Sequence, residues 1–473
     1  MKLLYLRNYE TIDTNMSESN VGGRKGRNCR DHIFVVNGII QDALSSKSSK
    51  GIDLFICDYR TMFDGLDVKT TLNDLYDNGV QDDNFALIYK LYQNSHVSIK
   101  TPVGATQRRR VEHAIITQGD SLGPILASST VDTFGKESFK KEKHLYYYRN
   151  KTPAGLLTML DDVFAISTCG PASIQLQEYI NLKSGCKKLQ FAREKTFGMH
   201  IGKKNPIFKC EESYIDCWET DQSTATEKYL GKVKVQQSYT SKCLGEMISS
   251  DGTNTANIAA RKRRGFGTVK DICSMLDNMC LGPYMVQKAV VLRNSMLVGT
   301  LLTCSEAWYN VSEAELGQLE QVDKSLWTSI LEVARTVPYD LVCLELGVEP
   351  LRFIIMSRRL IYLQFILKQK ETSLIKKFLI TQLSTLKKKD WAYTVKEDLK
   401  YLDIQLTVDE IEFMPKATYR NLIKKKISQK SLEYLLTKRN ARNGKGMQMS
   451  YSKLYIQNYL SSEDIDITNC ERK

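Results

Sequence analysis

The sequence lacks any apolar run that approaches the roughly 20 residues of a membrane-spanning helix. Its N-terminus, "MKLLYLRNYETIDTN", has too short an apolar stretch for a secretory signal. Twelve cysteines are scattered without a CxxC pair, and none of the five histidines stands near them in a zinc-finger spacing. These absences predict an intracellular protein with reduced thiols, without a membrane span and without a structural zinc site.

Internal repeats and long low-complexity linkers are also missing. The 473 residues allow about two to four domains, and 42% hydrophobic with 26% charged residues is an ordinary globular composition. Lys and Arg number 67 against 54 Asp and Glu, which gives a formal net charge of +13. This excess favours a polyanionic partner, nucleic acid before an acidic membrane surface.

Short apolar runs and helical patterns alternate in the first half of the chain. The run "IDLFIC", residues 52–57, predicts a buried strand, and "TLNDLYDNG", residues 71–79, predicts a helix. The stretches on either side of Gly104 predict a β-hairpin. A further helix is expected over 82–95, with an aspartate as N-cap and with an apolar stripe made of Phe85, Ile88, Leu91 and Tyr92.

Helices are expected to dominate from about residue 250. Two patterns, 257–276 and 313–331, carry apolar residues on one face, which favours burial in a core over a binding surface. These residues are Phe266, Val269, Ile272 and Leu276 in the first pattern, and Leu316, Leu319, Val322, Leu326 and Ile330 in the second. Arg261–Arg264 form a basic cluster, and the Lys-rich segment after about 336 predicts solvated helix faces that could also follow phosphates.

The adjacent aspartates Asp161 and Asp162 lie between two strand-like stretches, "GLLTML" and "VFAIS". Two strands joined there form a hairpin whose tip carries both carboxylates. Like charges repel and are costly to bury unpaired, so the pair indicates either a loop cap or a divalent metal site. An aspartate pair alone is weak evidence for a metal, because the chain holds another pair, Asp82 and Asp83, that is best interpreted as a helix cap.

A third acid strengthens the metal hypothesis. Asp58 directly follows the apolar run 52–57, and parallel edges of one sheet could bring it beside Asp161. Three such carboxylates suit two Mg²⁺ ions about 4 Å apart, the arrangement of phosphoryl-transfer sites. One ion would lower the pKa of a primer 3′-hydroxyl, and the other would hold the triphosphate. Without a cation the three carboxylates could not stay ionised side by side.

Five motifs follow one another in a specific order. They are "DYRTMFD" at 58–64, "QGDSLGPIL" at 118–126, "LDDVFAIS" at 160–167, "KKLQFAREKTFGMHIGKK" at 187–204 and "KCLGEMISSDG" at 242–252. Together they resemble the reverse transcriptase domain of non-LTR (LINE-type) retrotransposons, with the closest likeness to the Dong-type group. The upstream "GGRKGRNCRDHIF" resembles the family's glycine-arginine segment, and 301–331 and 344–367 resemble its thumb and post-thumb region.

The resemblance implies an α+β fold: a right-hand polymerase palm, made of a small antiparallel sheet with helices behind it, followed by an α-helical thumb. It places partial fingers at 1–50, the palm with remaining finger elements and a primer-grip hairpin at 51–250, the thumb at 251–335 and a basic helical post-thumb region at 336–473. The implied activity is RNA-directed DNA polymerisation.

The resemblance also implies partners. These are an RNA template, a DNA primer, dNTPs and two Mg²⁺ ions, for which Mn²⁺ could substitute. No membrane is involved, and the oligomeric state is left open. The expected location is the nucleus, with a cytoplasmic ribonucleoprotein stage.

Single residues match family positions with known roles. Asp58, Asp161 and Asp162 match the catalytic metal ligands, with the Tyr59 carbonyl as a further ligand. Phe63 matches the aromatic residue that packs under the deoxyribose and would clash with a 2′-hydroxyl. The alternative for Phe63 is an ordinary core aromatic.

Other matched positions concern the substrates. Gln118 and Gly119 match the loop that lines the nucleotide and template, with an ordinary turn as the alternative. Lys195 matches the lysine near the leaving pyrophosphate, a candidate general acid, with a solvated lysine as the alternative. Leu244 and Gly245 belong to the segment that resembles the primer-gripping hairpin.

The sequence departs from the family pattern in three places. Met159 stands where reverse transcriptases usually carry an aromatic residue. Only about twenty residues precede the glycine-arginine segment, and no nuclease acids or Cys/His cluster follow the last helices, so the chain looks truncated at both ends. In the family, basic residues of the preceding finger strands bind the incoming triphosphate. Here one of four basic residues would have to take that role: Arg24, Lys25, Arg27 or Arg30.

Other functions remain as alternatives. A catalytically inactive remnant would bind RNA or DNA through its basic thumb and tail without polymerising. A basic helical scaffold would bind neither. Asp58 and Asp64 also have the carboxylate spacing of RNA-dependent RNA polymerases, but Phe63 suits a DNA-making site and the aspartate pair follows Leu160 rather than glycine.

Overall fold

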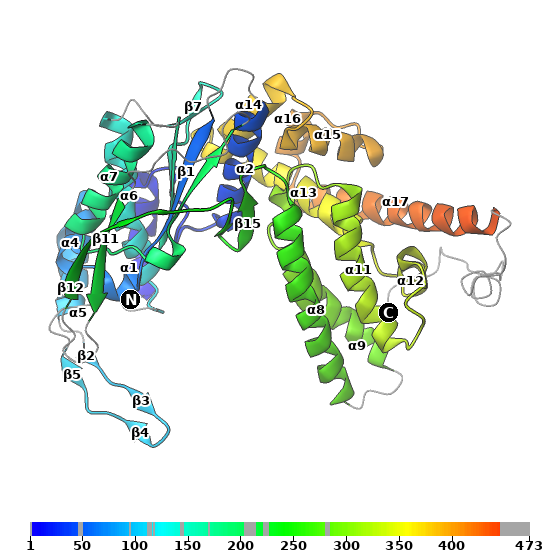
Figure 1. Ribbon diagram of the computed structural model, residues 1–473, viewed down its shortest axis with the longest axis horizontal. Helices are drawn as coiled ribbons and strands as arrows, with labels where there is room; N and C mark the ends of the chain where they lie inside the picture. Colours follow the sequence, from blue (N-terminus) through cyan, green and yellow to red (C-terminus); the bar gives the residue numbers. More distant parts are fainter. Residues whose placement is uncertain are drawn as a thin grey trace. The chain divides into compact units, whose positions relative to one another are not determined.

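The chain forms two compact units, one with helices and small sheets and one with helices, which together confirm the expected α+β class (Figure 1). The computed structural model describes residues 2–45, 51–93, 96–110, 116, 119–141, 146–168, 171–202, 214–220, 227–279 and 284–444. Unit 1 comprises Met1–Ala256, Ala307–Tyr309 and Gln369–Ala392, and unit 2 comprises Asn257–Glu306, Asn310–Lys368 and Tyr393–Lys473. The assignment of fingers, palm and thumb stays a prediction.

Unit 1 contains the sheets. Its helices are α1 (Lys2–Asn15), α2 (Cys29–Ser45), α3 (Met62–Gly65), α4 (Val68–Asp77), α5 (Asp82–Gln93), α6 (Gly123–Lys141), α7 (Pro171–Cys186), the single turn η1 (Arg193–Lys195) and α14 (Leu374–Thr385). Its longer strands are β1 (Ile52–Asp58), β8 (Leu156–Met159), β9 (Asp162–Ser167), β10 (Phe197–Ile201), β11 (Tyr214–Thr220), β12 (Glu227–Lys234), β14 (Thr240–Cys243) and β15 (Glu246–Ser249). Its two-residue strands are β2 (His96–Val97), β3 (Lys100–Thr101), β4 (Gly104–Ala105), β5 (Arg109–Arg110), β6 (Tyr147–Tyr148), β7 (Thr152–Pro153) and β13 (Gln236–Gln237).

A five-stranded sheet, in the order β13–β10–β1–β9–β8, forms the centre of unit 1. Its strands pair antiparallel except for β13, which runs parallel to β10. The predicted strand 52–57 is confirmed as most of β1, and residues 52–57 are all buried. Continuous rather than alternating burial is typical of a strand with both faces covered.

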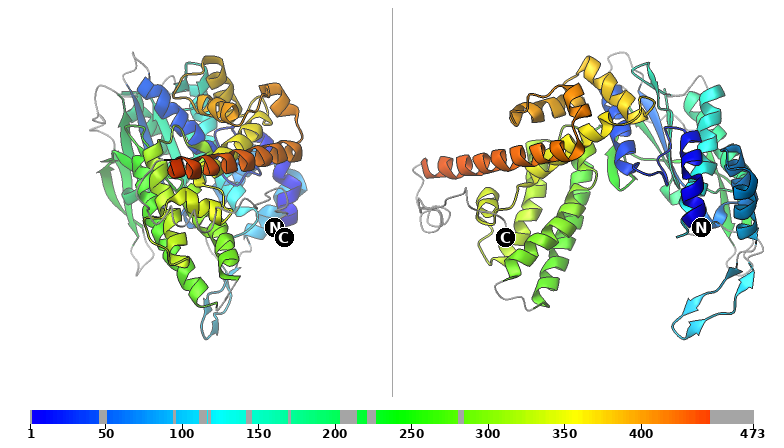
Figure 2. Two further views of the ribbon diagram at one scale, coloured as in Figure 1. Left: turned by 90° about the vertical axis from the view of Figure 1, so that its right-hand side faces the viewer. Right: turned by 180° about the vertical axis from the view of Figure 1, so that it is seen from behind.

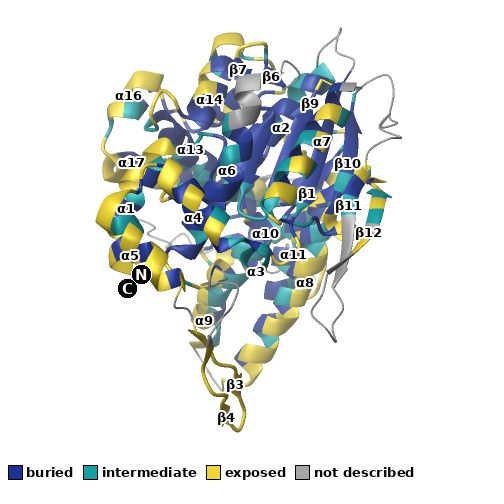
Figure 3. Cartoon of the chain, turned by 90° about the vertical axis from the view of Figure 1, so that its left-hand side faces the viewer, coloured by how far each residue is buried: buried dark blue, intermediate teal, exposed yellow. Residues whose placement is uncertain are grey.

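Helices cover both faces of this sheet (Figures 1 and 3). On one face, Phe55, Cys57 and Val163 belong to a hydrophobic core that residues of α4, α6 and α7 complete. On the other face lies α2, where the edge of the His32 ring meets Phe164 with the ring centroids 6.4 Å apart. The sheet is therefore a rigid support for whatever lies at its ends.

Both helices predicted in the first half of the chain are present as α4 and α5, and the hairpin around Gly104 is confirmed by the pairing of Thr101 with Gly104. One position of the predicted α5 stripe is wrong. Ile88 and Tyr92 are buried, but Leu91 is 43% exposed, because α5 packs with a face narrower than the apolar pattern.

Unit 2 is helical throughout its described residues (Figure 2). Its elements are α8 (Thr255–Asp277), α9 (Met285–Leu292), the π-helical turn η3 (Arg293–Leu297), α10 (Val298–Leu302), the short turn η4 (Ser305–Ala307), α11 (Glu313–Ile330), α12 (Tyr339–Glu345), α13 (Leu351–Leu367), α15 (Trp391–Tyr401), α16 (Val408–Phe413) and α17 (Lys416–Gly444). A buried ion pair supports the centre of the unit, since Arg293 Nη2 lies 2.6 Å from Asp323 Oδ2 and the Tyr339 hydroxyl donates to the same carboxylate.

The two apolar stripes predicted in unit 2 are mostly correct. All five stripe residues of α11 are buried, but in α8 Phe266 is 41% exposed while Val269, Ile272 and Leu276 are buried. Arg261, the first residue of the basic cluster, is buried, and its Nη1 donates to the Thr300 carbonyl oxygen at 3.0 Å. Charge alone did not indicate that a backbone acceptor was within reach.

A search of the described ranges finds no helix that combines the length and the apolar character needed to cross a membrane.

We expect His32 to make unit 1 sensitive to acid. Burial lowers its pKa from 6.5 to about 4, and the ring Nε2 bonds the Ser19 carbonyl oxygen at 3.1 Å. The unfolded chain therefore binds a proton below pH 6.5 that the folded chain does not bind until about pH 4, so the stabilising contribution is complete above 6.5 and is lost as the pH falls.

Urea unfolding of wild type and His32→Gln at neutral pH and at about pH 5 measures this effect. The wild type should lose about 2 kcal/mol more of its free energy of unfolding than the variant does on acidification. Equal losses in the two proteins would contradict the assignment to His32.

Candidate active site

The end of the central sheet brings together the acids that the sequence analysis singled out. β1 ends at Asp58 and the adjacent strand β9 begins at Asp162, and these two residues are direct partners in the ladder. The strands are antiparallel, so the expected parallel arrangement is wrong, although the convergence of Asp58 with the aspartate pair is present. In an antiparallel pair the end of one strand lies beside the start of the next, which gives the same juxtaposition.

The aspartate pair lies at a tight hairpin, as predicted. Met159 of β8 pairs with Asp162 of β9, so that Leu160 and Asp161 form a two-residue turn. Leu160 has φ 54°, a conformation that glycine adopts freely and that costs other residues about 1–2 kcal/mol. The Tyr59 amide donates to the Asp161 carbonyl oxygen at 3.2 Å, which ties the turn to the end of β1.

The glycine-arginine segment supports this turn from the other side. Residues 19–21 run beside β8, because the Val21 amide donates to the Thr158 carbonyl oxygen at 3.1 Å and the Thr158 amide donates to Ser19 at 3.0 Å. Gly22 follows directly, and a Cβ atom there would lie 2.7 Å from the Leu160 nitrogen. This close approach is a physical reason for glycine at position 22.

Two buried residues that the sequence analysis missed hold the segment in place. Asn20 Nδ2 donates to the Ser128 carbonyl oxygen at 2.8 Å, and Asn20 Oδ1 accepts hydrogen bonds from Ser128 Oγ at 2.7 Å and from the Gly22 amide at 3.0 Å. Ser128 lies on α6, 108 residues away along the chain. No sequence pattern links the two positions. The available signal was that Asn20 lies just before the glycine pair and Ser128 just after the "QGDSLGPIL" motif.

Lys195 contributes the one described cation that is ion-paired with this group of acids. Its Nζ lies 3.2 Å from Asp58 Oδ1, and its side chain is 60% exposed. The turn η1 that carries it is anchored by the Ala192 amide, which donates to the Asp58 carbonyl oxygen at 2.8 Å. The predicted neighbourhood of Lys195 to the catalytic acids is therefore present.

Burial and mutual repulsion dominate the electrostatics of the site. They raise the pKa of Asp162 from 3.8 to about 7, with burial as the largest cause, followed by the charges of Asp161 and Asp58. Burial also raises the pKa of Asp58, against the opposing effect of Lys195. Three carboxylates face one ammonium group, so the site favours an additional cation.

The residues present fit a hard divalent cation in their chemistry. Carboxylate oxygens are the ligands that Mg²⁺ prefers. Within the described ranges, however, no three His, Cys, Asp or Glu side chains are grouped tightly enough to hold a metal ion. The metal ligands assigned from the sequence stay a prediction.

Two aromatic residues follow Asp58. Tyr59 is buried, its hydroxyl lies 2.7 Å from Ser184 Oγ, and its ring stacks on Phe191 with the centroids 5.0 Å apart. Its side chain anchors the strand end, which leaves only its backbone for the predicted ligand role. Phe63 on α3 is partly buried against the core, a position that leaves both the sugar contact and the core interpretation open.

The structure describes three of the four remaining residues that were predicted to contact substrates. Gln118 lies outside the residues that the structure describes. Gly119 has φ 90° and open space around it, so glycine is required there by the backbone conformation. Leu244 and Gly245 form the turn between β14 and β15, with φ 48° and 86°, the geometry of a two-residue hairpin. Burial raises the pKa of the Cys243 thiol at the end of β14, and the Asp162 charge adds to this effect.

Arg24 does not fit the predicted triphosphate contact. It is buried, its Nε lies 2.7 Å from Asp13 Oδ1, and its other nitrogens donate to the backbone carbonyl oxygens of Asp13, Ser17 and Asn20. These bonds occupy the guanidinium within the fold. Arg24 thereby holds α1 against the glycine-arginine segment, and the triphosphate contact predicted for it, which stays a prediction, would require breaking these bonds.

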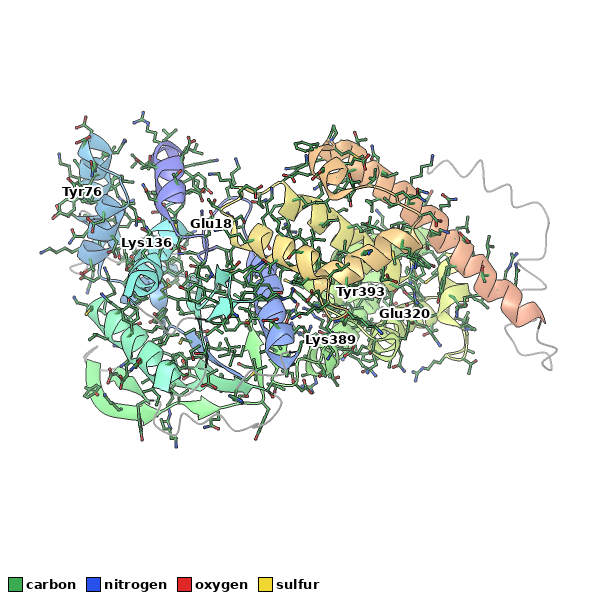
Figure 4. The ribbon with its side chains drawn as sticks, turned by 90° about the horizontal axis from the view of Figure 1, so that it is seen from above. Glu18, Tyr76, Lys136, Glu320, Lys389 and Tyr393 are labelled. Atoms are coloured by element: carbon green, nitrogen blue, oxygen red, sulfur yellow. The ribbon has the colours of Figure 1, made fainter. Side chains whose placement is uncertain are left out.

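Arg27 is also engaged within unit 1. Its Nη2 lies 2.6 Å from Oε2 of Glu18, which is labelled in Figure 4, and its Nη1 donates to Ser373 Oγ at 3.1 Å. The side chain is only 11% exposed. A nucleotide contact by Arg27 would require breaking this ion pair, so the structure disfavours the predicted role.

Comparison with protein-family models yields no match, and no curated protein matches the sequence. Among solved structures, the chain is similar to telomerase from Candida albicans in complex with a fragment of telomeric RNA, with 11% identity, a TM-score of 0.34, and coverage of 85% of this chain and 56% of that chain.

Two structures of telomerase from Candida tropicalis are similar to a comparable degree. The apo form has 12% identity, a TM-score of 0.35, and coverage of 77% of this chain and 56% of that chain. The complex with a telomeric RNA fragment has 12% identity, a TM-score of 0.38, and coverage of 86% and 56%. The chain thus spans about half the length of these proteins, and TM-scores of this size are too low to assign a fold.

We expect Gly22→Ala to destabilise unit 1 by about 1–3 kcal/mol, because the added methyl group would press on the Leu160 backbone nitrogen and on Ser128 Oγ, each 2.7 Å away. Gly185→Ala on α7 is the matched control, since a Cβ there meets nothing within 4 Å. Urea unfolding measures both. A Gly22→Ala variant as stable as Gly185→Ala would contradict the close packing.

Proposed function

We propose that this chain is the RNA-directed DNA polymerase domain of a non-LTR retrotransposon, acting in the nucleus on its element's RNA. The observation that carries the proposal is the placement of Asp58 opposite Asp162 at the end of the central sheet, with Asp161 in the adjoining turn. The order of the five sequence motifs supports it, because three of them, at Asp58, Asp162 and Lys195, meet at this one edge.

In this proposal Asp58, Asp161 and Asp162 hold Mg²⁺, which would supply charge neutralisation at the primer hydroxyl and at the triphosphate. The chain's own residues do the rest. Lys195 carries a proton on its Nζ beside the acids and is a candidate donor to the departing pyrophosphate. Phe63 would pack under the sugar and disfavour a ribonucleotide.

A second function is a catalytically inactive remnant that binds RNA or DNA. One observation favours it: Arg24 and Arg27, expected to substitute in the triphosphate contact, are used inside the fold. The two functions differ in nucleotide incorporation and share salt-sensitive binding.

Templated primer extension tests the choice. We expect Asp162→Asn to lower dNTP incorporation at least about 100-fold, because one carboxylate of the site loses its charge. Asp83→Asn is the matched control, since Asp83 belongs to the other aspartate pair, is exposed and lies in the first turn of α5. Incorporation by Asp162→Asn at the wild-type rate would remove the polymerase assignment, and no incorporation by any of the three proteins would favour the remnant.

Lys195 gives an independent prediction. We expect Lys195→Ala to lower the rate constant of incorporation about 100-fold while changing the free energy of unfolding by less than about 1 kcal/mol, because the Lys195 side chain is 60% exposed. Lys195→Arg keeps the charge but is a weaker proton donor. Single-turnover extension and urea unfolding separate the two effects, and an unchanged rate in Lys195→Ala would exclude the general-acid role.

A further inference from the structure

The hairpin between α5 and α6 has an unusual surface. Its strands pair as β2 with β5 and β3 with β4, and every residue from His96 to Arg109 is exposed. The register shifts by one residue between the pairs Val97–Arg109 and Lys100–Ala105, which indicates a bulge in the returning strand. We call residues 96–110 the arm. Figures 1 and 3 show it as a thin ribbon with the exposed strands β3 and β4 at its end.

The arm carries charge of one sign. Its sequence, "HVSIKTPVGATQRRR", contains no Asp or Glu, and it includes the exposed side chains of Lys100, Arg108 and Arg109. Elsewhere in unit 1 several basic residues are ion-paired with acidic side chains, such as Lys187 with Asp74 and Lys188 with Asp67. Like charges on an isolated two-stranded hairpin repel one another, and such hairpins are only marginally stable in water. A polyanionic partner would relieve both effects.

The arm also exposes apolar residues. Val97 is 48% exposed, Ile99 is 65% exposed, and Val103 at the tip is 97% exposed. Val97 pairs with Arg109 and therefore shares a face with it, so apolar and basic side chains stand side by side. Basic side chains with apolar neighbours suit a surface where phosphates flank sugars and base edges, and the wide, shallow minor groove of an A-form duplex presents such a surface.

We propose that the arm binds the backbone of a nucleic-acid duplex, with Lys100, Arg108 and Arg109 on the phosphates and the Pro102–Val103 tip directed into a groove. That this duplex is the RNA–DNA hybrid of template and primer rests on the proposed function. The backbone contact itself does not, since a catalytically inactive chain would make it equally.

Fluorescence anisotropy with a labelled RNA–DNA hybrid duplex, without dNTPs, tests the proposal across a series of salt concentrations. Each phosphate contact contributes about 0.9 to the slope of log K against log salt concentration. We expect the triple variant Lys100→Ala, Arg108→Ala, Arg109→Ala to lower this slope by two to three such contacts, about 2 to 3.

The control removes the same charge elsewhere. Lys69, Lys90 and Lys151 are exposed residues of unit 1 outside the arm, and their triple alanine variant should change the slope by less than one contact. An arm variant with the wild-type slope, or a control variant with an equal loss, would overturn the proposal. An equal loss on single-stranded RNA of the same length would overturn the choice of a duplex.

Substitutions at Val103 test whether the tip of the arm lies close to the nucleic acid. With a polyanion at the tip, Val103→Asp should weaken binding of the hybrid and Val103→Lys should tighten it, each by several-fold. The tip is almost fully exposed, so neither change disturbs a packed core. Unchanged binding of the hybrid in both variants would overturn the groove contact.

These measurements are independent of the chemistry at the acids. Asp162→Asn should bind the hybrid with the wild-type slope or slightly more tightly, because it removes a negative charge without touching the arm. If the wild type does not polymerise but the arm variant has the lower slope, the polymerase function is refuted and the arm contact is supported. If the wild type polymerises and the arm variant keeps the wild-type slope, the arm contact is refuted and the polymerase function is supported.

Discussion

The antiparallel register of β1 with β9 is the constraint on which the candidate site depends. It sets Asp58 directly opposite Asp162 and leaves Asp161 in the turn beside them, and among the residues that the structure describes Lys195 is the ion-paired counter-charge. Such a concentration of negative charge in a half-buried place is unfavourable by itself, as the raised pKa of Asp162 shows. Strongly shifted pKa values of this kind are common at functional sites.

The rest of unit 1 serves to hold that register. The sheet is covered on both faces, so β1 cannot slip without exposing its apolar side chains to water. The strained turn at Leu160 is kept in place by the Tyr59 amide on one side and by Gly22 on the other, and Asn20 ties that segment to α6. Strain that surrounding contacts maintain in this way is common where a chain positions functional groups.

Patterns with strong local signals were predictable. The continuous apolar run of β1, the turn around Gly104 and the apolar period of α11 each appear in the structure where the sequence indicated. The failures concern the relative direction of two strands and the burial of single side chains, both of which depend on residues far away along the chain. Arg24 and Arg261 carry charge that indicates a surface, yet each is buried because carbonyl oxygens from other segments accept its hydrogen bonds.

The sequence by itself determined which residues could take part in the chemistry: acids after apolar runs, a lysine within a recognisable motif, and a basic hairpin without acidic residues. Residue type and spacing are local properties, and they decide which secondary structure and which charge a segment carries. Only the tertiary structure decided that Asp58 and Asp162 face each other in an antiparallel ladder, that Lys195 reaches Asp58, and that Arg24 is buried and bonded to Asp13. Those relations arise from strand pairing and packing between segments more than 100 residues apart along the chain, or from hydrogen bonds made only once the chain has folded.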